Sequence, residues 1–474
     1  MYDVAVIGAG ITGACIVREL SKYDLKIIVI EGSYDIANGA TKANSGIVHA
    51  GYDAKEGTLK AKLNVLGNRM YEDLCRELNV PYKNNGSLVI AFNDEEMKTL
   101  ELLLNRGLKN GVEGLEIIDK NTLLNLEPNI SDRAKGALYA KSAGIVSPYE
   151  LALSLCESAY LNGAEFIFDA KVTNIIKEKG KFTISTSKGQ IISNFVVNAA
   201  GVNADEINKM LGGEKFSIIP RRGEYCLLDK SQGNIVNRII FNTPTEKGKG
   251  ILVSPTTHGN LLLGPNAHVI EDKLDVSTTG FGLEEVIEGA KKNIKNVNLR
   301  EIITSFSGVR ATPSTGDFII DVPTRGAVNA AGIESPGLTS APAIAIMVLE
   351  LLHKEGLTLN FKSDFKNGRI LPKRFIDMND EEKKAAIEKD KRYGKIICRC
   401  EQITEGDIVN AINCPLGAKT VDGVKKRLRA GMGRCQGGFC MPRVVEILSR
   451  ELKTEPENIL KADSGSYILT GKTK

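Results

Sequence analysis

The chemistry that the sequence indicates most clearly lies in residues 4–31, where glycines and one acid are spaced as in a dinucleotide site. An apolar run precedes Gly8, Gly10 and Gly13, and a second apolar run ends at Glu31. Strand, glycine turn, helix and strand in this order place a pyrophosphate at the unpaired N–H groups of the helix N-terminus. Glu31 follows Gly13 by 18 residues, where a carboxylate can accept hydrogen bonds from ribose hydroxyls. The motif predicts a dinucleotide without distinguishing FAD from NAD.

A second group of chemically competent residues lies near the C-terminus. Cys398 and Cys400 form one close pair, Cys435 and Cys440 form another, and 34 residues separate the pairs. Such clustering favours a metal over disulfides, and four thiolates suit either a [2Fe–2S] cluster or tetrahedral zinc. The other cysteines fit no pattern and are interpreted as free thiols: Cys15, Cys75, Cys156, Cys226 and Cys414.

Length and composition define the kind of protein that must position these groups. A chain of 474 residues predicts two or three domains, and 42% hydrophobic with 25% charged residues is typical of a globular protein. No apolar run reaches 18 residues, and the first strand begins within three residues of the start. We therefore expect no transmembrane segment, no signal peptide and a cytoplasmic location, with a peripheral position at the membrane left open.

The net charge of +4 conceals an asymmetry along the chain. Residues 362–474 hold 24 Lys and Arg against 16 Asp and Glu, whereas the remainder holds 38 against 42. The basic residues are interleaved with acids and are not accompanied by an aromatic platform. This favours a solvated face or an acidic protein partner over nucleic acid.

Two glycine-rich segments can pass close to a flat ligand. Residues 38–51 are small and polar and contain His49, and an apolar strand over 190–197 runs into Ala200 and Gly201. Apolar periodicity predicts helices over 59–79, 94–110, 119–126, 148–162 and about 341–353. It predicts strands over 86–92, 165–168, 172–177, 182–186, 225–228, 250–253, 260–263, 318–320 and 328–331.

Several blocks, taken in order, resemble one family over about residues 1–360. They are the glycine motif with Glu31, ANSGIVHAGYD (43–53), VVNAAG (196–201), RRGEY (221–225), GKGILVSP (248–255), SFSGVRA (305–311) and GIESPGLTSAP (332–342). They are similar to the FAD-dependent glycerol-3-phosphate dehydrogenase/oxidase and L-2-hydroxyglutarate oxidase branch of the D-amino-acid-oxidase-like superfamily. The resemblance implies FAD rather than NAD.

The C-terminal cysteines lie in a second resemblance, which covers about residues 396–450. CRCEQIT, a helix over 421–428, GRCQGGFC and a helix over 442–452 resemble the BFD-like [2Fe–2S] domain. This implies that Cys398, Cys400, Cys435 and Cys440 bind a [2Fe–2S] cluster, although spacing alone leaves zinc open. Similar modules follow the FAD domain in the anaerobic glycerol-3-phosphate dehydrogenase large subunit, which implies electron transfer to a protein partner, a second flavoprotein subunit.

Together these resemblances imply an α/β fold in three parts. A discontinuous Rossmann-like FAD-binding domain (1–80, 145–215 and 326–360) is interleaved with a β-rich substrate domain (81–144 and 216–325). A linker (361–395) with a surface helix then leads to a small helical iron–sulfur module (396–474).

The family resemblance also implies the site residues. His49 would remove the hydroxyl proton, Lys249 and Arg310 would hold an anion, and Ser335 would line the pocket. His258 is the rival base, and His268 and His353 are interpreted as structural. The implied FAD contacts are Gly8, Gly10, Gly13, Glu31, Thr41, Asn44, Ser45, Val172, Ala200, Gly201, Gly332, Gly337, Leu338 and Thr339.

Three functions follow from this reading. The first is FAD-dependent oxidation of sn-glycerol 3-phosphate to dihydroxyacetone phosphate, with electrons leaving through the cluster. The second is L-2-hydroxyglutarate dehydrogenase, which shares most of the blocks. The third, a non-catalytic flavin and iron–sulfur electron-transfer subunit, predicts a defective pocket, whereas His49, Lys249, Arg310 and Ser335 are all present.

Overall fold

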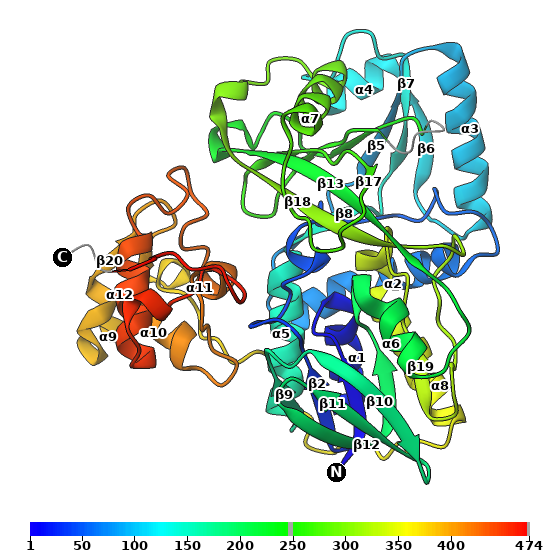
Figure 1. Ribbon diagram of the computed structural model, residues 1–474. Coiled ribbons are helices and arrows are strands. Elements are labelled where there is room, and N and C mark those ends of the chain that lie inside the picture. Colours follow the sequence, from blue (N-terminus) through cyan, green and yellow to red (C-terminus); the bar gives the residue numbers. More distant parts are fainter. Residues whose placement is uncertain (245–249, 472–474) are drawn as a thin grey trace.

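The computed structural model describes residues 1–244 and 250–471, and it places two large sheets and a separate C-terminal module (Figure 1). The predicted α/β class is confirmed. One sheet has seven strands in the order β10-β11-β12-β1-β2-β9, with β19 beside β12. Its strands are β1 (Tyr2–Ile7), β2 (Ile27–Ile30), β9 (Glu165–Ile167), β10 (Val172–Glu178), β11 (Lys181–Thr186), β12 (Gly189–Asn198) and β19 (Ala327–Asn329).

The centre of this sheet is parallel, and helices cover it. β1 lies parallel to both β2 and β12, and its residues 4–7 are buried. Such strands read as continuous apolar runs because both of their faces are covered. The helices of this region are α1 (Ile11–Ser21), α2 (Leu59–Glu77), α5 (Pro148–Leu161), α6 (Ala204–Met210) and α8 (Gly337–Lys354).

α8 begins about four residues earlier than predicted. In the described chain it is the one helix long and apolar enough to span a membrane, but 61% of it is buried. It packs against α1 and α2, and the carbonyl of Thr339 approaches Gly67 so closely that a Cβ there would lie 2.0 Å away. Its apolar character therefore serves the core, and it is only weak evidence for a membrane span.

The second sheet has nine strands and lies at the other end of the main body (Figure 1). Its order is β17-β13-β16-β15-β14-β5-β7-β6, with β18 beside β13. The strands are β5 (Ser87–Ala91), β6 (Leu115–Asp119), β7 (Gly136–Ala140), β13 (Ile218–Leu228), β14 (Ile239–Asn242), β15 (Val253–Pro255), β16 (Leu261–Leu263), β17 (His268–Val269) and β18 (Ile302–Pro313). Both sheets draw on interleaved segments, while the exact domain boundaries stay a prediction.

Three helices accompany this sheet, α3 (Asp94–Lys109), α4 (Lys120–Leu126) and α7 (Gly280–Asn293). The β-rich prediction did not include α7. Gly282 and Gly289 weaken the helical pattern, but close packing requires them. A Cβ at Gly282 would lie 2.4 Å from Glu224, and a Cβ at Gly289 would lie 2.4 Å from Ile251. The predicted strand over 318–320 is also wrong, since Ile319 forms only an isolated bridge with Ala331.

A small sheet of β3 (Ile47–Val48), β8 (Gly144–Val146) and β4 (Tyr82–Lys83) lies between the large sheets. The C-terminal module has its own apolar core. It contains β20 (Ile396–Cys398), β21 (Ile403–Thr404), α10 (Glu405–Asn413), α11 (Val421–Leu428) and α12 (Met441–Leu452), and α9 (Asp380–Lys389) precedes it as a helix without buried residues.

The module is joined to the main body by a buried ion pair. The Asp35 carboxylate accepts hydrogen bonds from both Arg427 amino groups at 2.7 and 2.8 Å, and Lys426 Nζ lies 3.1 Å away. Although burial opposes it, Arg427 and Lys426 lower the pKa of Asp35 from 3.8 to about 2.

This lowered pKa makes docking of the module pH-dependent. The ionised form adds about 2 kcal/mol of stability above pH 4, which is lost as the pH falls from about 4 to about 2. Asp35→Asn should lose about 3–5 kcal/mol at neutral pH, because Arg427 stays buried without its counter-charge. Urea unfolding of the full chain at several pH values measures both the pH dependence of stability and the loss in Asp35→Asn. The exposed pair Arg443–Glu446 supplies the control, and Glu446→Gln should change stability by less than about 0.5 kcal/mol.

Candidate functional site

The glycine motif forms the tight turn that the sequence predicted. Gly8 has a φ of +106°, and a Cβ there would lie 2.4 Å from the carbonyl oxygen of Ala199. A Cβ at Gly13 would lie 2.0 Å from Gly8 O, so only glycine lets α1 approach the sheet this closely. The turn therefore brings the N-terminus of α1 to the carboxyl ends of β1 and β12.

The N-terminus of α1 offers donors to an anion. Ile11 N–H donates to Thr41 Oγ1 at 2.9 Å, while the N–H groups of Thr12 and Gly13 have no acceptor among the described residues. Glu31 directly follows β2, and its carboxylate accepts hydrogen bonds from Ala9 N–H at 2.6 Å and Ser33 N–H at 2.8 Å. Burial raises the pKa of Glu31, and these two N–H groups oppose the rise. Donors for phosphate and an acceptor for ribose thus lie together, as a dinucleotide requires.

The backbone of His49 is held at three points. Its N–H donates to Thr339 Oγ1 at 2.8 Å, and its carbonyl oxygen accepts from Asn64 and Asn68, each at 3.1 Å. Its ring lies against Phe241 with the ring centroids 5.8 Å apart. Thr339 therefore positions the His49 loop.

One face of the β13–β18 ladder lies over the same loop. Gly308 approaches Ala43 so closely that a Cβ would lie 2.1 Å from its carbonyl oxygen. Arg310 lies two residues further along β18, on the same face, and is paired in register with Arg221 of β13. Two arginines from neighbouring strands therefore face one region, and Arg221 is a site residue that the sequence analysis did not identify.

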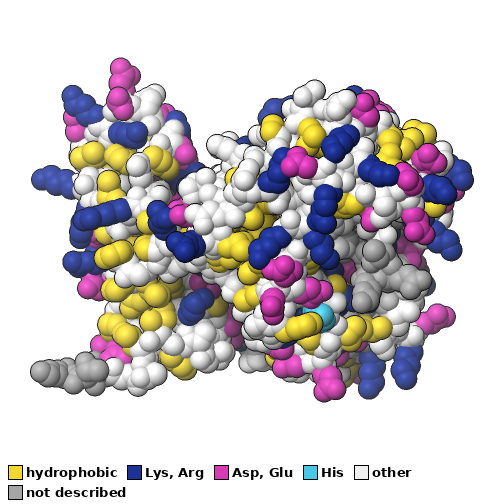
Figure 2. Space-filling view, turned by 90° about the horizontal axis from the view of Figure 1, so that it is seen from above, with side chains coloured by type: hydrophobic (Ala, Val, Ile, Leu, Met, Phe, Trp, Pro, Cys, Tyr) yellow, Lys and Arg dark blue, Asp and Glu magenta, His cyan; other side chains and the backbone are white. Residues whose placement is uncertain are grey.

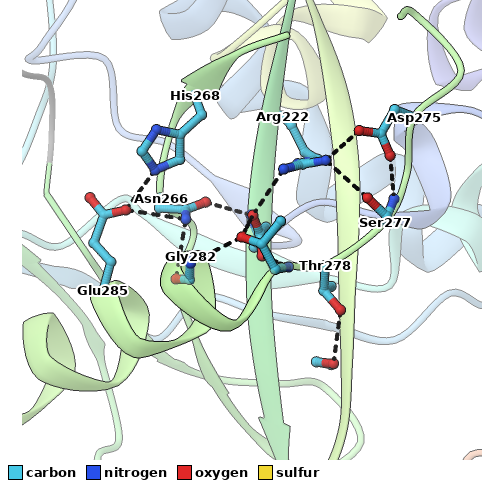
Figure 3. Close-up of polar contacts among 11 residues, drawn as sticks. Arg222, Asn266, His268, Asp275, Ser277, Thr278, Gly282 and Glu285 are labelled. Carbon is cyan, nitrogen blue, oxygen red and sulfur yellow. Dashed lines mark hydrogen bonds and ion pairs between the residues drawn. The ribbon is translucent and has the colours of Figure 1, made fainter.

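The adjacent arginine, Arg222, serves the opposite face (Figure 3). Its guanidinium contacts Asp275 at 2.5 Å, Ser277 at 3.0 Å and the buried Glu224 at 3.5 Å. In the same network His268 contacts Glu285 at 2.7 Å. The two amino groups of the Arg222 guanidinium are thus bound by structural partners. Arg221 and Arg310, in contrast, form no ion pair with a carboxylate in the described chain.

A single cavity of about 2190 Å³ connects these regions. It is large enough for an extended dinucleotide and a small substrate. Of the predicted residues, it is lined by Gly8, Gly10, Glu31, Thr41, Asn44, Ser45, His49, Val172, Ala200, Gly201, Arg310, Ser335, Gly337 and Leu338. Gly13, Gly332 and Thr339 lie behind this wall, and Lys249 lies outside the described residues.

His258 also lines the cavity, but it is engaged. Its Nε2 lies 2.7 Å from Glu150, a buried carboxylate on α5. Although burial opposes it, His258 lowers the pKa of Glu150. This contact occupies Nε2 and leaves Nδ1 as the ring nitrogen that could accept a substrate proton, so His258 stays the rival base.

The four predicted ligand thiols meet in two pairs. Cys400 Sγ and Cys435 Sγ lie 3.9 Å apart, and Cys398 is hydrogen-bonded to Cys440. The contact with Cys440 lowers the pKa of Cys398 to about 6, although burial of the thiol acts to raise it. No three His, Cys, Asp or Glu side chains of the described chain converge on one metal ion. Two thiol pairs suit two irons better than one tetrahedral zinc.

Comparison with known proteins supports both parts of the site. Residues 3–351 match the family model for FAD dependent oxidoreductases, and residues 396–450 match the BFD-like [2Fe-2S] binding domain. A glycerol 3-phosphate dehydrogenase of Caloramator mitchellensis is 52% identical over 100% of this chain and 99% of its own length.

Two further relatives match only part of this chain. The structure of an L-alpha-glycerophosphate oxidase from Mycoplasma pneumoniae with FAD bound is 30% identical with a TM-score of 0.74, and covers 78% of this chain and 99% of its own. An L-2-hydroxyglutarate dehydrogenase of Escherichia coli K12 is 31% identical over 61% of this chain and 69% of its own. The chain therefore belongs to the FAD-dependent oxidoreductase family, with FAD as its cofactor and a C-terminal BFD-like domain for a [2Fe–2S] cluster.

Proposed function

We propose that the protein is an FAD-dependent CH–OH dehydrogenase that oxidises sn-glycerol 3-phosphate to dihydroxyacetone phosphate. The observation that carries this proposal is the pair formed by Arg221 and Arg310, which line the cavity side by side on neighbouring strands and form no ion pair with a carboxylate among the described residues. Two guanidinium groups are suited to a phosphate dianion, which each can hold through two hydrogen bonds.

The other residues of the cavity have complementary tasks. His49 accepts the proton of the secondary hydroxyl, since an imidazole is a suitable base near neutral pH. Bound FAD supplies the acceptor for the hydride of the carbinol carbon. Ser335 lines the same cavity. Lys249, which is not among the described residues, is the third proposed anion-binding residue.

The C-terminal module supports a dehydrogenase that passes its electrons to another protein. The relative named glycerol 3-phosphate dehydrogenase covers this module, whereas the glycerophosphate oxidase structure covers only 78% of the chain. At the cluster Cys400 is exposed and Phe439 is 84% exposed. Figure 2 shows the module as a separate lobe with many projecting Lys and Arg side chains. We propose that an electron-accepting partner, a second flavoprotein subunit, binds at this surface. We also propose that the two proteins act together in the cytoplasm.

Anaerobic flavin reduction tests the substrate. sn-Glycerol 3-phosphate should bleach the flavin absorbance of the purified holoenzyme, while L-2-hydroxyglutarate should leave it unchanged. Arg221→Met should raise the half-saturating concentration of glycerol 3-phosphate by roughly ten- to hundredfold, because a charge-assisted contact is lost. Arg325→Met, outside the cavity, serves as the control. Bleaching by L-2-hydroxyglutarate and not by glycerol 3-phosphate would reverse the assignment.

A further inference from the structure

The iron–sulfur module forms part of the wall of the FAD cavity. Eight of its residues line that cavity, and six of these are charged: Asp422, Lys425, Lys426, Arg429, Lys461 and Asp463. They lie on or near α11, which packs against α5 on the side of the main body that faces the module (Figure 1). The same cavity includes Gly10 and Thr12 at the start of α1, so the module and the phosphate-binding turn line one cavity.

The module also holds the loop that follows Glu31. Asp463 accepts hydrogen bonds from Tyr34 N–H at 2.9 Å and from Asn38 Nδ2 at 3.0 Å. Lys426 Nζ donates to Ile36 O at 2.5 Å and to Asn38 Oδ1 at 2.6 Å. With the buried contact of Asp35, these bonds fix a segment that borders the ribose acceptor.

Lys425 differs from the cations around it. Arg429 is paired with Glu401, Lys461 with Asp422, and Lys426 with Asp35. Lys425 lines the cavity and is half-buried, but in the described parts of the chain it has no ion pair and no hydrogen bond from its ammonium group.

The surroundings of Lys425 favour an anion. Burial lowers its pKa, and the charges of Lys461, Lys42 and Arg429 lower it further against the opposing effect of Asp422. Lys42 directly follows Thr41, whose hydroxyl binds the first residue of α1. A cation without a partner therefore lies in a positively charged part of the cavity wall that also holds the phosphate-binding turn.

We propose that Lys425 binds a phosphate oxygen of FAD, so that the iron–sulfur module completes the flavin-binding site. The side chain reaches across from the module, while the N–H groups of α1 supply the donors of the main body. Occupancy of the FAD site and docking of the module are then linked, because each stabilises the other.

Titration of FAD-depleted protein with FAD, followed by quenching of flavin fluorescence, tests this role. Lys425→Met should weaken FAD binding by roughly tenfold, and Lys425→Arg should restore most of the affinity. Lys419→Met is the matched control, because Lys419 is exposed on the same module and does not line the cavity. ADP should show the same loss as FAD, whereas adenosine, which lacks the phosphates, should bind both proteins equally.

The visible absorbance of the cluster shows whether each variant keeps a folded module. An unchanged FAD affinity in Lys425→Met would overturn the proposal. An equal loss in Lys419→Met would do so too, because the effect would then come from general charge. A loss that extends to adenosine would place Lys425 away from the phosphates.

Discussion

Replacing His49 by Gln should slow reduction of the flavin by substrate by roughly 10²–10⁴-fold, the usual contribution of a general base. The backbone of this residue is fixed by Thr339, Asn64 and Asn68, so the substitution should leave the loop in place. Glutamine is polar and of similar size but cannot accept the hydroxyl proton. The loss should therefore appear in the rate of reduction at saturating substrate.

Stopped-flow absorbance under anaerobic conditions measures this rate directly. In the wild type the rate should fall at low pH, because a protonated imidazole cannot accept the hydroxyl proton, and this dependence should disappear in the variant. His258→Gln tests the rival base, whose Nε2 is held by Glu150, and if His49 is the base the rate of this variant should stay within a few-fold of the wild type. A large loss in His258→Gln with a normal rate in His49→Gln would exchange the two roles.

The elements that sequence predicted well are those whose signals are local. The turn at Gly8, Gly10 and Gly13 follows from the glycine spacing and the apolar strands beside it. α11 and α12 also lie within one residue of their predicted ends, because capping and apolar periodicity act over short distances. α7 was missed for the opposite reason, since two of its glycines, Gly282 and Gly289, are required by distant neighbours, Glu224 and Ile251.

The site residues that sequence missed depend on register and docking. Arg221 and Arg222 are adjacent, and nothing in the RRGEY block distinguishes them. Only the pairing of β13 with β18 places Arg221 beside Arg310, while Arg222 binds Asp275 on the other face. Lys425 is still less predictable, because it belongs to a different module and reaches the cavity only when that module is docked.

Replacing Cys435 by Ser should remove the [2Fe–2S] cluster and the electron exit while leaving flavin reduction by substrate intact. Cys435 is half-buried beside the exposed Cys400, whereas Cys398 and Cys440 lie in the core of the module. Serine at 435 therefore removes an iron ligand with little loss of packing. The variant should lose the broad iron–sulfur absorbance and its electron paramagnetic resonance signal after reduction.

Anaerobic titration with substrate makes the loss quantitative. FAD accepts a hydride, so the variant should be fully reduced by about one substrate molecule per flavin. The wild type should require more, because the cluster takes up a further electron. Cys414→Ser is the matched control, since its thiol lies in the same module and contacts only Ala411 O in the hydrogen-bond network. If wild type and Cys435→Ser reached the same end point with stoichiometric zinc in the wild type, the thiol pairs would hold zinc, and electrons would have to leave the flavin by another route.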